Sequence, residues 1–241
     1  MKDGQPTAAE FDEYSAEYEG GMEQPLKRAL GRSLDVFARQ KIRWMLRDLG
    51  RFPLRTASAT PRLLDYGCGT GLTLQLLEEA GFAGELEGCD VSGGMLQQAA
   101  RRWPSGAGPR LRHLTDDDAL ASASYDIVWC AAVLHHVERS GRCALFATFA
   151  RILKPGGRLY VFEHNPLNPL TRFIVSRTPI DRNAHLLSAN AVQCGMRAAG
   201  LRPERTSYFL FFPPRVPLVD TLERPLSWLP VGGQYMAVGY R

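Results

Sequence analysis

Residues 63–71, LLDYGCGTG, carry three glycines within five positions, directly behind a short apolar run that ends in an aspartate. Glycine permits a tight turn, and it lets a ligand approach the backbone where a Cβ would otherwise stand. Amide hydrogens and the start of a following helix favour a negatively charged group at such a turn. The stretch therefore predicts a ligand-binding loop between a strand and a helix.

Short apolar runs alternate with segments of helical spacing on both sides of this loop. The strand-like runs are RLLDYG, ELEGCD, RLRHLT, YDIVWC and RLYVFEH, and helix-like segments such as GGMLQQAARRW and CALFATFARIL stand between them. This alternation indicates crossover units in a parallel sheet with helices on both faces, an α/β fold. Residues 26–49 add an amphipathic helix ahead of the sheet.

Two further strands, ERTSYFLFF and GQYMAVGYR, follow Gly200 and are predicted to form an antiparallel pair. The connector between them, residues 213–231, is long and rich in proline, as functional connectors often are. The aromatic run SYFLFFPP has two interpretations, the wall of an apolar acceptor pocket or sheet core.

Several ligands are compatible with a glycine loop. A P-loop would need Gly-Lys-Ser/Thr, but Gly71 is followed by Leu72 and Thr73, which excludes it. A dinucleotide site wants G-x-G-x-x-G and an acidic residue about 20 positions on; Asp90 meets the second demand, whereas the glycine spacing is G-x-G-x-G. Asp65 lies beside the place of a pyrophosphate, where a carboxylate is unfavourable, so it favours a nucleoside carrying an amino acid.

Composition narrows the class of protein. The 241 residues, 45% of them hydrophobic, suffice for one large domain, and the net charge of +4 is too small to indicate a nucleic-acid partner. The five cysteines form no CxxC pair, so neither a disulfide framework nor a metal site is predicted. With no signal peptide and no apolar window long enough for a membrane span, a cytoplasmic location is expected.

Four stretches in order carry a family resemblance: LLDYGCGTG, LEGCDVSGGML, YDIVWCAAVLHHV and ARILKPGGRLYVFEH. They resemble the successive motifs of the class I S-adenosylmethionine-dependent methyltransferases, in particular the small-molecule group that includes quinone-biosynthesis enzymes, over residues 60–165. The resemblance implies a Rossmann-like, doubly wound, mostly parallel seven-stranded sheet with an antiparallel C-terminal strand. It also implies a helical cap or lid over residues 1–59 and a methyltransferase domain over residues 60–241, with substrate-facing insertions at about 163–187 and 213–231.

The resemblance also implies which residues bind S-adenosylmethionine. Asp65 and the loop residues Gly67, Cys68, Gly69 and Gly71 would face the methionine end, and Asp90 would accept hydrogen bonds from both ribose hydroxyls. Asp116 and Asp117 would hold the adenine, Cys130 would offer backbone contacts near the methionine amino group, and Tyr18 would close over the cofactor.

The predicted activity is methyl transfer to a small-molecule acceptor, such as a secondary metabolite or a glycan or lipid intermediate. Positioning of the acceptor supplies most of the catalysis, and His136, His135 and His164 are the candidate bases if the acceptor must lose a proton. Three alternatives stay open: a non-catalytic cofactor-binding partner subunit, an NAD-dependent oxidoreductase, and a nucleic-acid methyltransferase. The last alternative is disfavoured by the small net charge and by the absence of an Asn/Asp-Pro-Pro-Tyr/Phe motif after the fourth strand, where CAAV stands instead.

Overall fold

The computed structural model describes residues 34–115, 120–181, 184–212 and 219–241. Seven strands form one sheet in the order β3-β2-β1-β4-β5-β7-β6. Their bounds are β1 Arg62–Tyr66, β2 Glu85–Asp90, β3 Arg110–His113, β4 Tyr125–Ala131, β5 Leu153–His164, β6 Arg202–Phe209 and β7 Gln234–Tyr240. The first five strands pair in parallel, and β7 lies antiparallel between β5 and β6. This confirms the predicted fold class, including the antiparallel C-terminal strand.

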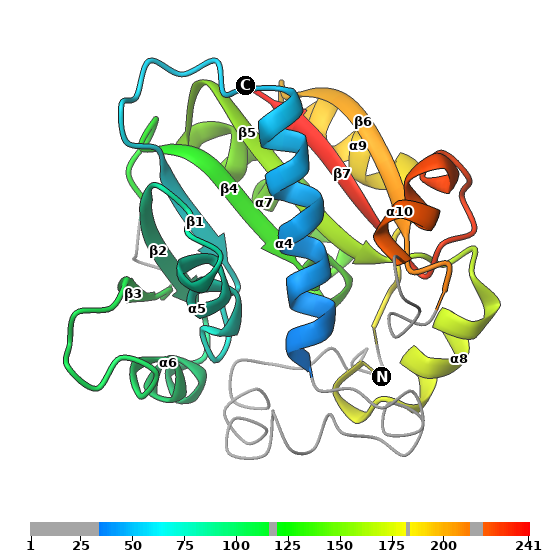
Figure 1. The fold of residues 1–241 in the computed structure, drawn as a ribbon, viewed down its shortest axis with the longest axis horizontal. Coiled ribbons are helices and arrows are strands. Elements are labelled where there is room, and N and C mark those ends of the chain that lie inside the picture. The colour runs from blue at the N-terminus through cyan, green and yellow to red at the C-terminus, as the bar shows by residue number, and fades with distance from the viewer. Residues whose placement is uncertain (1–33, 116–119, 182–183, 213–218) are drawn as a thin grey trace.

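Helices cover both faces of the sheet (Figure 1). The α-helices are α4 Leu34–Arg51, α5 Leu72–Glu79, α6 Gly93–Ala100, α7 Arg139–Ile152, α8 Pro169–Arg177, α9 Ala189–Ala198 and α10 Val219–Glu223; short 3-10 helices are η1 Leu134–His136, η2 Pro179–Asp181 and η3 Arg224–Leu226. One large core cluster lies between the sheet and α7 and α9, and a second lies between the sheet and α4. No described helix is both long enough and apolar enough to span a bilayer.

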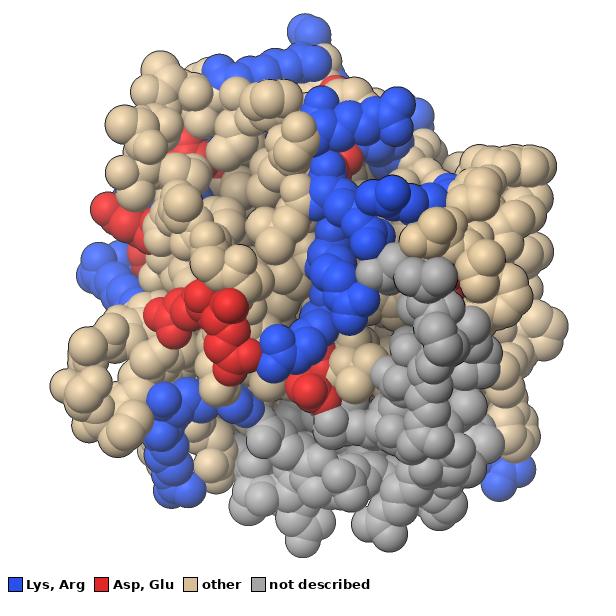
Figure 2. All heavy atoms as spheres, viewed as in Figure 1, with Lys and Arg blue, Asp and Glu red and all other residues tan. Residues whose placement is uncertain are grey.

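Helix α4 crosses one face of the sheet, and its sequence pattern explains why. Ile42, Trp44 and Met45 are buried against the strands, whereas Arg39, Arg43 and Arg51 point away from the core. Figure 2 shows a column of basic side chains over the place that α4 occupies in Figure 1. The predicted amphipathic helix is thus confirmed over the residues from 34 onward.

A buried network of charged and polar groups fixes α4 to the last strands. Asp48 accepts hydrogen bonds from the Tyr160 hydroxyl at 2.8 Å, from Arg158 at 3.2 Å and from Arg205 at 2.5 Å. Because Tyr160 and Arg158 belong to β5 and Arg205 to β6, one carboxylate joins three elements. The last turns of α4 are thereby fixed, which places its first turns toward the carboxyl ends of the parallel strands (Figure 1).

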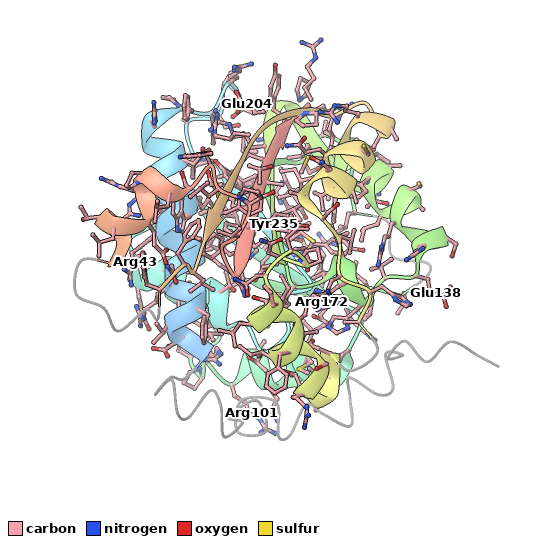
Figure 3. All side chains as sticks on the ribbon, turned by 90° about the vertical axis from the view of Figure 1, so that its right-hand side faces the viewer. Arg43, Arg101, Glu138, Arg172, Glu204 and Tyr235 are labelled. Carbon is pink, nitrogen blue, oxygen red and sulfur yellow. The ribbon has the colours of Figure 1, made fainter. Side chains whose placement is uncertain are left out.

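Two segments predicted to face the substrate are connected to each other beside β7. The Asn165 side chain donates to the carbonyl of Pro230 at 3.0 Å, and the Asn168 side chain donates to the carbonyl of Val231 at 2.7 Å. Figure 3 shows α8, marked by Arg172, beside the part of β7 that carries Tyr235. The described part of the connector between β6 and β7 includes the five-residue helix α10.

Candidate functional site

The glycine loop follows β1 and leads into α5. Gly67, Gly69 and Gly71 have φ angles of 76°, 51° and 75°, the left-handed region that side chains rarely adopt. A Cβ on Gly67 would lie 2.4 Å from Cγ2 of Val133, in the segment that follows β4. Glycine at position 67 is therefore required both by the backbone conformation and by the close approach of this segment.

The backbone amides of this loop donate hydrogen bonds to the end of β2. Gly67 and Cys68 both donate to the carbonyl of Cys89, at 2.8 and 3.0 Å, and Gly69 donates to Oδ2 of Asp90 at 2.8 Å. A pyrophosphate would need such amides, so this arrangement does not favour a dinucleotide. The Asp90 carboxylate, which also accepts from the Ser92 amide at 2.9 Å, keeps lone pairs for ribose hydroxyls. Its burial raises the pKa of Asp90, and the backbone hydrogen bonds oppose this rise.

Asp65 offers a buried carboxyl group at the end of β1. The residue is 2% exposed, and its Oδ2 has no hydrogen-bond partner among the described residues. Burial, followed by the nearby Asp90 carboxylate, raises the pKa of Asp65 to about 8, while Lys41 acts in the opposite direction. A ligand ammonium group would satisfy this carboxylate, so the residue fits the methionine end of S-adenosylmethionine.

A cavity of about 320 Å³ opens at the carboxyl ends of the parallel strands. One side consists of the glycine loop, residues 67–70, with Ala131 and Ala132. The other side is formed by α8 and by residues 210–212, and α4 contributes Phe37, Ala38 and Lys41. Volumes of this size are typical of small-molecule sites.

A buried glutamate, Glu223, shapes the wall made by residues 210–212. Its carboxylate accepts from the amides of Phe211 at 2.8 Å and Phe212 at 3.2 Å, and from the Gln40 side chain of α4 at 2.9 Å. The backbone after β6 is thus bent toward the cavity, with Leu210 at a φ of 61°. Both interpretations of the aromatic run apply to part of it: residues 210–212 line the cavity, whereas Phe209 is buried in the core of the sheet.

The three candidate histidines cluster where β4 and β5 end, but only two of them border the cavity. His136 and His164 line it together with Asp181, whereas His135 is fully buried beneath them. His135 Nδ1 lies 2.5 Å from Glu163 Oε2, and the other Glu163 oxygen accepts from the Leu134 amide at 2.8 Å.

The pKa values of the three imidazoles differ because their neighbours differ. Burial lowers the pKa of His135, but the Glu163 and Asp181 carboxylates outweigh burial and raise it to about 9. Burial lowers the pKa of His136, and burial together with the charge of His135 lowers that of His164 to about 4. The neighbouring carboxylates therefore favour the protonated form of His135, whereas burial favours the neutral forms of the two cavity histidines.

The remaining predicted residues are placed as follows. Cys68 borders the cavity, and burial raises the pKa of its thiol, so it is an uncharged lining group. Cys130 packs its side chain into the core, and its neighbours Ala131 and Ala132 border the cavity instead. Gly71 is the N-cap of α5. Tyr18, Asp116 and Asp117 lie outside the described residues and stay predictions.

Sequence reasoning missed several cavity residues. Asp181 and Gln234 belong to no sequence motif. Each reaches the cavity only because the folded chain brings its segment there. Lys41 lies on α4, an amphipathic helix in which no motif marks a ligand-binding residue. The long insertion at 163–187 was the one usable signal for Asp181.

Comparison with known proteins agrees with this geometry. Residues 63–157 match the family described as "Methyltransferase domain". The chain is 31% identical over 170 residues to a ubiquinone/menaquinone biosynthesis C-methyltransferase of Syntrophotalea carbinolica, covering 69% of this chain and 65% of that protein. It is 32% identical over 150 residues to a trans-aconitate 2-methyltransferase of Acidovorax sp., covering 57% and 56%.

Solved structures share the fold. A possible histamine N-methyltransferase of Thermotoga maritima superposes with a TM-score of 0.64 at 18% identity, covering 95% of this chain and 97% of that one. The magnesium protoporphyrin IX methyltransferase of Synechocystis, solved with bound SAH, gives 0.61 at 18%, covering 97% and 94%.

The sheet order, the glycine loop and the cavity define a Rossmann-like methyltransferase fold. Residues 63–157 are a methyltransferase domain of the S-adenosylmethionine-dependent class, which confirms the family recognised from the sequence motifs. The chain spans between a quarter and about half of the length of the first curated relatives it matches.

Proposed function

We propose that the protein transfers a methyl group from S-adenosylmethionine to a small-molecule acceptor, with residues 60–241 as the catalytic domain and residues 1–59 as a cap. The observation that carries this proposal is the cavity, which has the glycine loop on one side and an apolar wall on the other. When bound, the cofactor supplies a methyl group on a sulfonium. The protein then contributes chiefly by orienting the acceptor, worth on the order of 7–11 kcal/mol for a well-aligned pair.

On the cofactor side, Asp65 would pair with the methionine ammonium and Asp90 would accept the ribose hydroxyls. The backbone of Gly67, Cys68 and Gly69 lies between these two carboxylates along the cavity edge. Gly71 and the backbone of Cys130 complete the methionine end in this proposal. Asp116, Asp117 and Tyr18 are retained as proposed adenine and lid residues.

The acceptor side favours a molecule with an apolar body and one polar end. Leu170, Ile174 and Phe211 line the cavity there, while the Gln234 side chain, 3.4 Å from His164 Nδ1, offers polar atoms. Lys41 is the one lysine or arginine among the described residues that line the cavity, whereas a tricarboxylate such as trans-aconitate would need several cationic partners. The lining therefore favours an amphipathic acceptor, such as a phenol or a hydroxylated ring.

If the acceptor is a hydroxyl or an amine, a histidine would take its proton. His136 and His164 are the candidates, because both border the cavity. His135 is enclosed and paired with Glu163, so in this proposal it acts as a positioning residue that holds η1 in place.

Calorimetric titration with S-adenosylmethionine, S-adenosylhomocysteine and NAD, followed by transfer of an isotope-labelled methyl group to a panel of acceptors, tests the proposal. We expect binding of both sulfur nucleosides, no response to NAD, and transfer to phenolic acceptors in preference to tricarboxylates. Cofactor binding without transfer to any acceptor, together with stable association with a second protein, would instead support the non-catalytic subunit. Binding of NAD alone would contradict both functions. Asp65→Asn is the matched variant, since it keeps the side-chain shape and removes the charge.

A further inference from the structure

Three ligand-type atoms converge at the histidine cluster, and their separations are long for charge-assisted hydrogen bonds. Asp181 Oδ1 lies 3.5 Å from His135 Nε2 and 3.4 Å from His136 Nε2. Hydrogen bonds between such charged groups are shorter, about 2.7–2.9 Å. Two ligands of a tetrahedral Zn²⁺, each bound at about 2.0–2.1 Å, lie roughly 3.4 Å apart. The two separations from Asp181 therefore match those of ligands that share one small cation, and the ligand atoms of all three residues lie within 4.8 Å of one another.

The fold holds these side chains together from two distant segments. His135 and His136 are consecutive in η1, with ring centroids 4.2 Å apart and ring planes inclined by 50°. Asp181 ends η2, within the insertion that follows β5. The amide of His185 donates to the carbonyl of His135 at 2.9 Å, so the insertion is fastened directly to η1.

A further carboxylate lies behind the cluster, as is common for metal-bound histidines. Glu163 Oε2 faces His135 Nδ1 at 2.5 Å, and Glu163 itself is anchored by the Leu134 amide at 2.8 Å. With the proton on Nδ1 directed at Glu163, His135 presents Nε2 to Asp181. Carboxylate–histidine pairs of this kind set the tautomer and orientation of metal ligands.

The burial and the charge of these side chains both favour a bound cation. The side chains of His135, His136 and Asp181 are 0%, 12% and 9% exposed, and Glu163 is fully buried with them. Two buried carboxylates demand compensating positive charge, which a divalent cation bound between them would supply. His136 and Asp181 also border the cavity, so a fourth coordination position would face the acceptor.

We infer that His135, His136 and Asp181 form a binding site for a divalent cation of the Zn²⁺ type, with the fourth position open to the cavity. Three protein ligands with one open position are typical of catalytic zinc sites. Octahedral ions with ligands at about 2.0–2.1 Å would bring neighbouring ligand atoms closer, to roughly 2.9 Å, which disfavours Mg²⁺. The sequence predicted no metal site, because histidines at positions 135 and 136 show no ligand spacing without Asp181.

The site stands on its own geometry and goes beyond methyl transfer. When it is occupied, His136 is a ligand, and an acceptor oxygen at the open position would lose its proton more readily. His164 also borders the cavity without belonging to the ligand set, so it remains the candidate base.

Metal binding by the full-length, tag-free protein tests this inference without any activity assay. Protein stripped with a chelator is titrated with Co²⁺, whose visible spectrum intensifies in tetrahedral sites, and then with Zn²⁺, which should displace Co²⁺. We expect one equivalent per chain, a tetrahedral spectrum, and a higher melting temperature with Zn²⁺. Absence of binding, or a response to Mg²⁺ with none to Zn²⁺, would overturn the inference.

Variants locate the binding. Asp181→Asn and His136→Ala should abolish the tetrahedral spectrum, and Glu163→Gln should weaken Zn²⁺ binding roughly 10- to 100-fold. His185→Ala is the control, because its exposed side chain lies outside the ligand set and should leave binding unchanged. If Asp181→Asn folds, as judged by its melting curve without metal, and still binds Zn²⁺ like the parent, the site is refuted. Should His136→Ala fail to fold, Asp181→Asn decides alone.

Discussion

The amide of Gly69 donates to Oδ2 of Asp90 at 2.8 Å, which joins the glycine loop to the end of β2. A side chain proposed to hold the ribose therefore also holds the loop proposed to face the methionine. Replacing Asp90 with alanine should remove both functions and weaken S-adenosylhomocysteine binding by about 1.5–3 kcal/mol. Calorimetry at constant pH measures this change.

Two further variants isolate the role of Asp90. Asp90→Asn keeps the side-chain shape and one acceptor oxygen, so it should retain part of the affinity that Asp90→Ala loses. Glu85→Ala removes an exposed carboxylate from the other end of the same strand, where it pairs with Arg62 at 3.1 Å, and should leave cofactor binding unchanged. Equal cofactor affinity for Asp90→Ala and the parent would remove the ribose assignment.

The raised pKa of Asp65 predicts that cofactor binding depends on pH. With a pKa of about 8, the carboxyl of the empty protein is largely protonated at pH 6, and it must lose that proton to pair with an ammonium group. S-adenosylhomocysteine affinity should therefore rise with pH, by up to about tenfold per unit between pH 6 and 8, and level off above. Calorimetry in buffers of different ionisation enthalpy should show proton release.

Two comparisons separate the Asp65 contact from other effects of pH. Asp65→Asn should bind more weakly and lose this pH dependence, and a thioether nucleoside without the amino acid should bind the parent with little pH dependence. A parent affinity that stays flat from pH 6 to 8 would contradict the proposed ammonium contact. Asp65 contributes to stability in the opposite direction: its contribution to the unfolding free energy of the empty protein, taken as the difference between the parent and Asp65→Asn, should fall as pH rises from about 4 to 8, because the folded state retains a proton that the unfolded chain releases.

Gly67 should tolerate no side chain. Gly67→Ala places a Cβ 2.4 Å from Val133 Cγ2 at a φ of 76°, so the loop and the segment after β4 must separate. We expect a destabilisation of about 1–3 kcal/mol and a loss of cofactor affinity, measured by chemical denaturation and calorimetry. Gly50→Ala is the control, since nothing lies within 4 Å of its Cβ and it sits in a helix, where alanine is favoured. Parent-like behaviour of Gly67→Ala would show that the loop is not held as described.

The sheet and the glycine loop could be predicted from the sequence because both depend on local patterns. The apolar run before Gly67 and the period of the following helix are visible within a dozen residues, and they determine how β1, the loop and α5 are arranged. The antiparallel pairing of β6 and β7 was predicted from two consecutive strand-like runs after Gly200, and the family resemblance implied an antiparallel C-terminal strand. The family match confirms that resemblance over residues 63–157.

The acceptor side could not be predicted in the same way, because its residues meet only through tertiary contacts. Asp181 reaches the histidines from the insertion after β5. Glu223, at the end of α10, bends the segment 210–212 by accepting hydrogen bonds from its backbone amides. Neither carboxylate lies in a motif. The burial of His135 is equally invisible in the sequence, where it is indistinguishable from its neighbour His136.

The buried carboxylate of Asp48 should be the strongest single anchor of α4. Its removal leaves Arg158 and the Tyr160 hydroxyl in the interior without this partner, and Arg158 itself is 2% exposed. Asp48→Ala should therefore lower the unfolding free energy by about 3–5 kcal/mol, measured by urea denaturation. Glu79→Ala is the matched control, because its pair with Arg39 at 2.7 Å is exposed and worth about 0–1 kcal/mol. Similar losses for the two variants would show that Asp48 does not fasten α4, and would weaken the case for Lys41 and Phe37 as cavity residues.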